Sequence, residues 1–564
     1  WSSPKAIVEE SSPPPPPPAA LEALVARAKV LPLAYAAWWR RLLRESPEHV
    51  LVETLLILFL VFVVWAGRRQ RAKQESVVRL SKKEVDELVA EWEPEPLVPE
   101  RPLVAEIAKR KKVVESWTET TISFDGGRPL LNCGTLAFLA GAGGDAGKEA
   151  AKRALEKYGC GSCGPRGFYG SIDVHEELEA KMASFFGAER AIAFSDAASC
   201  ATSTIAAFAK RGDLLVVDEK ISEPLRTGCV LSRANVTAFA HHDVADLARV
   251  LAAVAEDDQK KKRPEGTQRR FVVVEAVGRT DCDVAPLEPM LTLCHDYGYR
   301  LILDEGLSFG VLGTHGRGLS EHLADNAKEA AKEAAAAGKE ADEDKAERAL
   351  ESKRAALEKK TKPPPVDITI VDLGPALGSV GGLCLGNDDV IEHQRLSGAG
   401  YCFSAAAPPF VSAVALAALE TKLDPGVLET LRRNAKVLRD SLRSTGLVPA
   451  FFRARTLANP RDDVVPVVHL ALAHHQKSGD DHRDVHVDLN TLDAIANAMA
   501  HAGFAVAVVK HGLEREFKLP SKLLPTLPHA PLALKVATNA SHEPHELLAL
   551  CTALKLATKP YLAS

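Results

Sequence analysis

Glu275 and Asp304 carry the chemistry that this sequence places most clearly. Each carboxylate ends a short apolar run, residues 271–275 and residues 300–304, and a helical pattern lies between the two runs. Such runs predict buried strands of a mostly parallel sheet with crossover helices. Ligands of these sheets bind beyond the carboxyl ends of the strands. We therefore expect Glu275 and Asp304 to lie at one end of the sheet, next to a ligand site.

A third run, residues 368–382, predicts another buried strand followed by a turn rich in glycine. Gly378, Gly381 and Gly382 lie in this turn, and no lysine occurs from residue 363 to residue 395. On these residues alone, tight packing of the turn explains the glycines.

Residues 158–170 contain glycines with the spacing GxGxxG and a CxxC formed by Cys160 and Cys163. A dinucleotide site needs a strand before this spacing and a helix that starts on its third glycine. Here a helical pattern precedes the glycines and Pro165 follows them, so we do not expect nucleotide binding. No second cysteine pair follows at the spacing of metal ligands, so we expect no metal site.

The elements that must position these residues begin near residue 146. Alternating helical and strand patterns predict a large α/β domain over residues 146–425, followed by a smaller α+β domain over residues 426–564. Residues 322–365, which are rich in Ala, Lys and Glu, interrupt the large domain. We expect a solvated, partly helical insertion there, and a partner-binding role for it stays open.

The N-terminal part predicts attachment to a membrane. Residues 1–49 are expected to form a proline-rich leader and an interfacial helix. The apolar residues 50–67 span roughly 27 Å as a helix, which is close to the thickness of a bilayer core, and predict a transmembrane helix. Residues 68–145 follow as a linker and N-terminal arm. The basic residues at the start of this linker favour a cytosolic C-terminal body.

Composition limits the remaining possibilities. The chain is 46% hydrophobic and 26% charged, as is ordinary for globular proteins. Its formal net charge is −5, and no basic stripe interleaved with aromatic residues occurs, so nucleic acid is not an expected partner. Ten cysteines are few for this length, and we expect reduced thiols rather than a disulfide framework.

Four blocks of this sequence, in order and with matching spacing, resemble the α-oxoamine synthases, which are fold-type I transferases that depend on pyridoxal phosphate. Residues 158–179 fit the family pattern YGxGxxGxR followed by HxxLE. Residues 275–287 and 303–318 are similar to its blocks EGxxSMxGxxxPL and DEAHSxGxxGxxGRG. Residues 403–409 are similar to the segment that reaches the cofactor phosphate of a neighbouring subunit. The resemblance implies the fold-type I architecture over roughly residues 125–560, apart from the insertion.

The same resemblance implies that this chain has lost part of the family's cofactor site. Asp304 stands where the family's aspartate pairs with the pyridine nitrogen. Ser222 stands in place of the stacking histidine, Arg279 in place of a serine near the ring oxygen, and Leu307 in place of the histidine of DEAH. Pro375 stands at the lysine position, so the chain is expected to lack the covalent cofactor bond and to have no catalytic residue of its own.

Within that family, the cysteine-containing string at 158–170 and the missing lysine are similar to the non-catalytic large subunits of eukaryotic serine palmitoyltransferases. The resemblance implies pairing with a lysine-bearing subunit that holds pyridoxal phosphate covalently. The pair would condense L-serine with palmitoyl-CoA to 3-ketosphinganine, the first step of sphingolipid synthesis. It also implies a single-pass protein of the endoplasmic reticulum membrane with a cytosolic body, a small activating subunit and an Orm-type regulator.

Several residues are expected at the subunit interface or beside a pocket. The resemblance implies that Ser404 reaches the cofactor phosphate of the partner, although a helix-capping serine explains it equally well. Arg166 is expected to form a structural ion pair rather than to bind a carboxylate or acyl-CoA. The other candidates are Cys160, Cys163, Phe168, Tyr169 and Ser222.

The chain departs from its family at a substrate-binding position, and two other functions stay open. Ala533 and Lys535 stand where catalytic members place arginines that can hold a substrate carboxylate, which weakens serine binding by this chain. A catalytically active α-oxoamine synthase and a lipid-sensing scaffold on an inactive fold remain the two alternatives.

Overall fold

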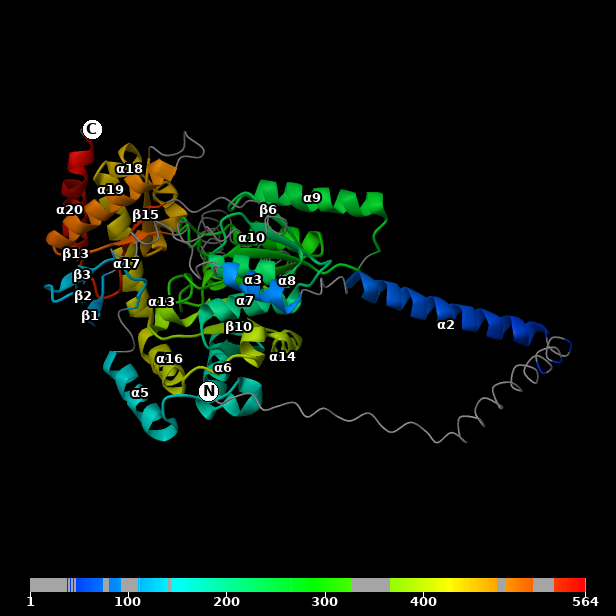
Figure 1. Ribbon diagram of the computed structural model, residues 1–564. Helices are drawn as coiled ribbons and strands as arrows, with labels where there is room; N and C mark the ends of the chain where they lie inside the picture. Colours follow the sequence, from blue (N-terminus) through cyan, green and yellow to red (C-terminus); the bar gives the residue numbers. More distant parts are fainter. Residues whose placement is uncertain are drawn as a thin grey trace, which may run out of the picture. The chain divides into compact units, whose positions relative to one another are not determined.

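The structure is a computed structural model in which the chain forms two compact units, Trp1–Glu100 and Arg101–Ser564 (Figure 1). The described residues are 38, 41, 44, 47–74, 81–92, 110, 112–139, 144–264, 266–326, 366–473, 482–510 and 532–562. Most of the expected leader (1–49) and of the expected insertion (322–365), and part of the linker (68–145), lie outside them.

The first unit contains two helices in its described part. Helix α2 covers Pro47–Gln74, and helix α3 covers Lys82–Glu91. α3 begins with a capping box, because Ser81 accepts from the amide of Glu84 while the Glu84 carboxylate accepts from the amide of Ser81. Among the described residues, no helix combines the length and apolarity needed to cross a bilayer. The helix expected over 50–67 is thus present within α2, which continues through a basic segment, but the membrane span is not confirmed.

The second unit is built on a seven-stranded sheet in the order β4-β10-β9-β8-β7-β5-β6. Strands β9, β8, β7, β5 and β6 are parallel, while β10 runs antiparallel to both β4 and β9. The expected mostly parallel sheet is therefore confirmed. The strands are β4 (Arg190–Phe194), β5 (Leu214–Asp218), β6 (Asn235–Phe239), β7 (Arg270–Glu275), β8 (Arg300–Asp304), β9 (Ile368–Asp372) and β10 (Gly382–Gly386).

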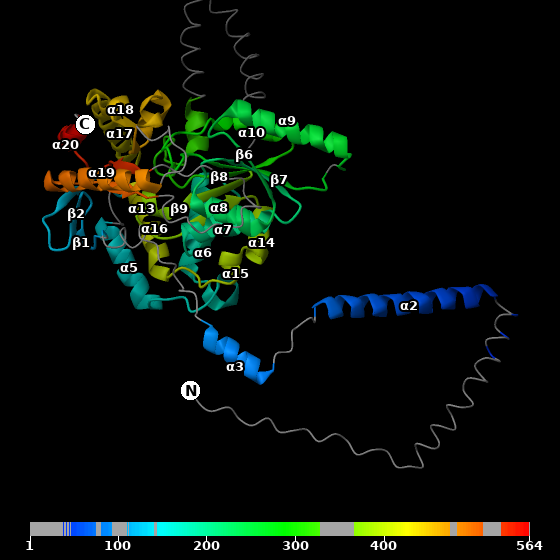
Figure 2. The ribbon, with the colours of Figure 1, turned by 45° about the horizontal axis from the view of Figure 1, so that its top comes forward.

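Alternate residues of each strand point to opposite faces of this sheet. Both faces are covered, since the residues of each face belong to a separate hydrophobic cluster. Val272 and Val274 belong to one hydrophobic cluster, whereas Phe271 and Val273 belong to another. The first cluster includes residues of α6, α9, α10 and α16, and the second those of α7, α8 and α14. Figure 2 shows α7 and α8 lying together across the sheet. These helices are α6 (Asp173–Phe186), α7 (Ala197–Phe208), α8 (Glu223–Ser232), α9 (Val244–Lys261), α10 (Leu287–Asp296), α14 (Asp388–Ser397) and α16 (Pro409–Lys422).

The remaining elements are two four-stranded sheets, the helices that pack on them, and three helices, α5, α13 and α15, that pack against the elements of the large sheet. One sheet has the order β1-β2-β3-β13 and the other β11-β12-β15-β14. A third cluster joins α17, α19 and α20 to the second of these sheets. The strands are β1 (Val114–Trp117), β2 (Thr121–Phe124), β3 (Leu130–Asn132), β11 (Phe452–Arg453), β12 (Val467–Leu472), β13 (Phe504–Ala505), β14 (Ala507–Val509) and β15 (Ala533–Ala537). The helices are α5 (Gly144–Tyr158), α13 (Leu373–Leu377), α15 (Ala399–Cys402), α17 (Pro425–Ser444), α18 (Leu447–Ala450), α19 (His482–His501) and α20 (Pro544–Leu562), with short helical turns η1 (Arg166–Gly170), η2 (Arg455–Leu457) and η3 (Pro460–Val464).

The strand register brings three carboxylates to one edge of the large sheet. Glu275 and Asp304 are register partners at the ends of β7 and β8. Asp304 also pairs with Ile370 of β9, and Asp372 ends that strand two residues later. The parallel strands therefore place Glu275, Asp304 and Asp372 at the same edge, as the apolar runs predict for the first two.

Candidate functional site

A cavity of about 280 Å³ lies at this edge, and we call it the strand-end pocket. Asp304 and Asp372 line it from the sheet, and the starts of α7 and α8 close its other side. Its lining residues are Ala197, Ala198, Ala201, Ile221, Ser222, Glu223, Pro224, Arg226, Arg279, Thr280, Asp304, Ile370 and Asp372. The pocket occupies the place where parallel α/β sheets bind ligands.

Asp304 and Glu275 are buried carboxylates that backbone amides hold in place. Asp304 accepts a hydrogen bond from the amide of Gly306 at 2.7 Å. Glu275 accepts from the amide of Ser222 at 3.2 Å and from that of Arg279 at 3.0 Å. Burial and the charge of Asp304 raise the pKa of Glu275 to about 7. Burial also raises the pKa of Asp304, against the opposing effect of the Arg279 charge.

Arg279 supplies a positive charge inside the pocket. Its Nη2 lies 3.0 Å from Oδ2 of Asp372, 93 residues later in the chain. Nη2 and Oδ1 of Asp304 both lie next to Gly306. A Cβ placed on Gly306 would be 2.4 Å from Nη2 and 2.8 Å from that Oδ1. The guanidinium is therefore held at the turn after β8, beside both aspartates.

Pro375 lies in the glycine-rich turn, where the resemblance places the lost lysine. The short helix α13 follows β9, begins with Asp372 capping the amide of Gly374 at 2.9 Å, and buries Pro375. The Pro375 carbonyl accepts from the amide of Phe138 at 2.9 Å. Pro375 lines a neighbouring cavity of about 440 Å³ together with Arg279 and Asp372.

These residues do not fit a covalently held pyridoxal phosphate. The glycine-rich turn offers proline instead of an amine, and Asp304 already faces the Arg279 cation. Lys148 lines the neighbouring cavity from α5, but its side chain is 70% exposed and lies 3.5 Å from Asp145. This chain alone therefore lacks the groups that would hold this cofactor covalently.

Ser222 precedes the first residue of α8, makes no side-chain capping hydrogen bond there, and lines the strand-end pocket. Its Oγ is buried and has no hydrogen-bond partner among the described residues. A small hydroxyl thus replaces the aromatic ring that the resemblance expects over the cofactor.

The other expected site residues form a second group, the aromatic loop, which comprises residues 160–170 and lies next to the turn before α16. The amide of Ala406 donates to the carbonyl of Gly164 at 2.9 Å, and the Ser162 hydroxyl donates to the carbonyl of Ala406 at the same distance. Ser404 lies in that turn and is partly buried. Ser404 is not among the residues that line the strand-end pocket of this chain.

Arg166 anchors the aromatic loop through ion pairs. Its guanidinium lies 2.7 Å from Glu179 and 2.9 Å from Glu176, both on α6. Arg166 itself is only 5% exposed. The structure thus shows Arg166 in a structural ion pair with a buried carboxylate, as expected from the sequence.

The tip of the aromatic loop presents its side chains to solvent. Phe168 is 67% exposed and Tyr169 is fully exposed, with a left-handed φ of 67° at Tyr169. Cys160 and Cys163 are exposed free thiols. The structure therefore separates the candidates into two groups, one in the pocket and one on this loop.

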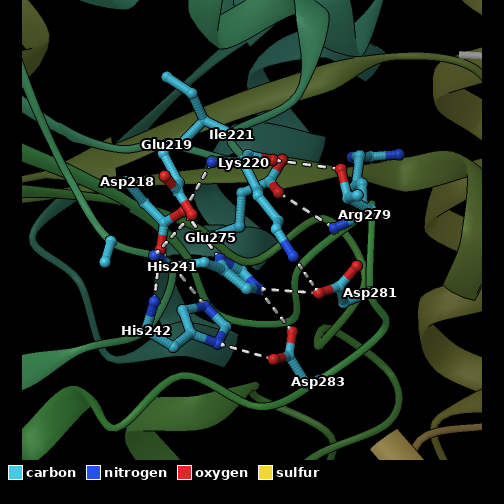
Figure 3. A network of polar contacts seen from close by, with 12 residues as sticks. Asp218, Glu219, Lys220, Ile221, His241, His242, Glu275, Arg279, Asp281 and Asp283 are labelled. Atoms are coloured by element: carbon cyan, nitrogen blue, oxygen red, sulfur yellow. Dashed lines mark hydrogen bonds and ion pairs between the residues drawn. The ribbon is translucent and has the colours of Figure 1, made fainter. Parts of the chain in front are cut away.

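Sequence reasoning missed a buried cluster behind the pocket, shown in Figure 3. His241 lies 2.8 Å from Asp218 through Nδ1 and 3.0 Å from Asp283 through Nε2. Burial lowers the pKa of His241, but the hydrogen bonds to both aspartates outweigh it and raise this pKa to about 10. The ring of His242 stacks on that of His241, with 3.9 Å between ring centroids. The sequence could have marked His241 as a site candidate, because it follows the strand 235–239 closely.

Comparisons with known proteins agree with this fold. Residues 131–451 match the family model of aminotransferases class I and II. The chain is 31% identical to Long chain base biosynthesis protein 1 of Arabidopsis thaliana, over 92% of this chain and 95% of that protein. It is 28% identical to serine palmitoyltransferase 1 of Saccharomyces cerevisiae, over 91% of this chain and 89% of that protein.

A solved structure extends the agreement to three dimensions. Serine palmitoyltransferase of Sphingomonas wittichii superposes with a TM-score of 0.61 at 22% identity, covering 81% of this chain and 97% of that one. The fold is thus that of the fold-type I transferases, as the sequence resemblance implies. The chain belongs to the aminotransferase class I and II family, in the group of relatives named Long chain base biosynthesis protein 1 and serine palmitoyltransferase 1.

Proposed function

We propose that this chain is the non-catalytic subunit of a serine palmitoyltransferase and acts in the synthesis of sphingolipid long-chain bases. A lysine-bearing partner subunit completes the enzyme, which condenses L-serine with palmitoyl-CoA to 3-ketosphinganine. The observation that carries this proposal is Pro375 in the glycine-rich turn, in a chain that matches its relatives over nearly its whole length.

In this proposal the partner holds pyridoxal phosphate covalently, and this chain completes the shared site. The exposed aromatic loop supports such a role, because large exposed aromatic side chains are enriched at the centres of protein interfaces. Ser404, in the neighbouring turn, donates a hydrogen bond to the partner's cofactor phosphate. A small activating subunit and an Orm-type regulator are further proposed partners.

Co-expression with a lysine-bearing homologue tests the proposal. We expect a stable heterodimer whose palmitoyltransferase activity disappears when either chain is omitted. Borohydride reduction followed by peptide mass spectrometry should find the pyridoxyl-lysine on the partner. A pyridoxyl-lysine on this chain would show an active synthase instead. A chain that forms no complex, or whose removal leaves activity unchanged, would favour the lipid-sensing scaffold.

We also propose that the chain is attached to the endoplasmic reticulum membrane with its body in the cytosol. Support comes from α2, where the large apolar side chains from Leu55 to Trp65 are exposed. Carbonate extraction of microsomes should leave the chain in the pellet, and protease added from the cytosolic side should digest Arg101–Ser564. Release of the intact chain by carbonate would contradict the proposal.

A further inference from the structure

Three carboxylates lie at or next to the strand-end pocket, which Asp304 and Asp372 line directly. Glu275, Asp304 and Asp372 approach one another at the ends of three neighbouring strands. Glu275 and Asp304 are 3% and 6% exposed. Buried carboxylates are costly unless a cation or hydrogen bonds compensate them. A fixed positive charge in this pocket therefore stabilises the ionised forms of these carboxylates.

Arg279 meets this requirement from inside the chain. Its backbone amide donates to Glu275 (Figure 3), and its guanidinium pairs with Asp372 at 3.0 Å. The same guanidinium lies next to Gly306, and so does Oδ1 of Asp304. Arg279 thus reaches the carboxylates of three strands in three ways: its backbone amide bonds Glu275, its guanidinium pairs with Asp372, and the same guanidinium lies beside Asp304.

We propose that Arg279 is a built-in counter-ion that takes the electrostatic place of a protonated cofactor ring beside Asp304, and that its guanidinium, fixed there by the salt bridge to Asp372, closes this pocket to pyridoxal phosphate. The missing lysine removes the covalent bond, whereas Arg279 removes the ring's own binding site. The inference concerns this chain alone and holds with or without a partner subunit.

The binding test uses pyridoxamine 5′-phosphate, which needs no lysine, and the full-length chain without a partner. Thermal shift and fluorescence titration should show no saturable binding to the wild-type chain. Arg279→Ser, which restores the residue type that the family resemblance expects, should bind saturably at a concentration at least about tenfold below the highest one at which the wild-type chain shows no binding, since removing the Arg279 charge leaves Asp304 free to pair with the pyridine nitrogen. Equal binding by both chains would overturn the proposal.

A stability test keeps the proposal falsifiable if Arg279→Ser folds poorly. Arg279→Met should lower the melting temperature by several degrees, because it leaves the buried carboxylates without their cation. Arg279→Met combined with Asp304→Asn should recover most of this loss. A double variant as unstable as Arg279→Met alone would show that Arg279 does not serve Asp304, and would overturn the inference.

Arg226 provides a matched control, because it lines the same pocket on α8. Its guanidinium donates to the backbone carbonyls of Ile221 and Glu219, each at 2.8 Å. Asp304→Asn should therefore give no recovery to Arg226→Met. Recovery of both arginine variants would mean that Asp304→Asn stabilises the chain in general, and the specific pairing would be rejected.

Discussion

At the scale of single residues, His241 shows how strongly burial and pairing can act together. The imidazole is held between two buried aspartates, Asp218 and Asp283, and further charged groups, Lys220 and Asp281, lie beside it. Both ring nitrogens are hydrogen-bonded to carboxylates, which requires the doubly protonated, charged ring. Burying that charge is tolerated only because the carboxylates compensate it.

The His241 cluster makes stability depend on pH in a defined direction. The folded-state pKa of about 10 lies above the ordinary 6.5, so the contribution of His241 is fully present below about pH 6.5 and is lost as pH rises towards 10. We expect His241→Asn to cost roughly 3–5 kcal/mol of unfolding free energy near pH 6.5. Urea unfolding across this range should show that the difference in unfolding free energy between wild type and His241→Asn becomes smaller as pH rises. A difference that stays constant with pH would contradict the charged state of His241.

The residues of the site differ in how far the sequence could predict them. Glu275 and Asp304 were predictable as strand-end groups because each ends a local apolar run. The Arg279–Asp372 pair was not, since 93 residues separate its members and no local pattern links them. Arg279 was visible only as a departure from a family motif. What it contacts depends on the order of the strands, which no local period encodes.

At the scale of elements, the strand patterns predicted the centre of the large sheet well. The runs 271–275 and 300–304 became β7 and β8, within one residue at their ends. The antiparallel insertion of β10 between β4 and β9 was not predictable, because a buried apolar strand has the same pattern in either direction. That insertion brings the glycine-rich turn against α7 and so shapes the strand-end pocket.

Gly382, the first residue of β10, is a position in the large sheet with no room for added volume. A Cβ there would lie 2.6 Å from Cβ of Cys200 and 2.7 Å from Cα of Ala197, both on α7. Gly382→Ala must therefore push β10 and α7 apart, and we expect a loss of about 1–3 kcal/mol in unfolding free energy. Gly161→Ala is the matched control, since a Cβ on Gly161 meets nothing within 4 Å. Equal stability of both variants by calorimetry would contradict this tight packing.

At the scale of the whole molecule, the two groups of candidate residues have different places. One group lines an internal pocket, and the other lies on the surface. The strand-end pocket is closed from within by Arg279. The aromatic loop instead points outward, anchored by the Arg166–Glu179 ion pair and fixed to the turn that carries Ser404. Family motifs could place both groups along the sequence. Their separation in space became clear only from the fold.

The last prediction follows from this outward-facing loop and rests on the proposed heterodimer. The backbone of Phe168 and Tyr169 lies in a hydrogen-bonded turn, where the amides of Phe168 and Gly170 both donate to the carbonyl of Pro165, so little backbone entropy is lost when a partner covers them. We expect Phe168→Ala and Tyr169→Ala each to weaken association with the lysine-bearing subunit by about 1–3 kcal/mol, while the melting temperature of this chain stays unchanged. Leu556→Ala is the control, because Leu556 is 66% exposed on α20, away from this loop. Affinity measured by surface plasmon resonance on co-purified subunits decides the matter. If the two loop variants bind as tightly as wild type and as Leu556→Ala, the aromatic loop is not at the interface, and the partner must be bound by another surface of Arg101–Ser564.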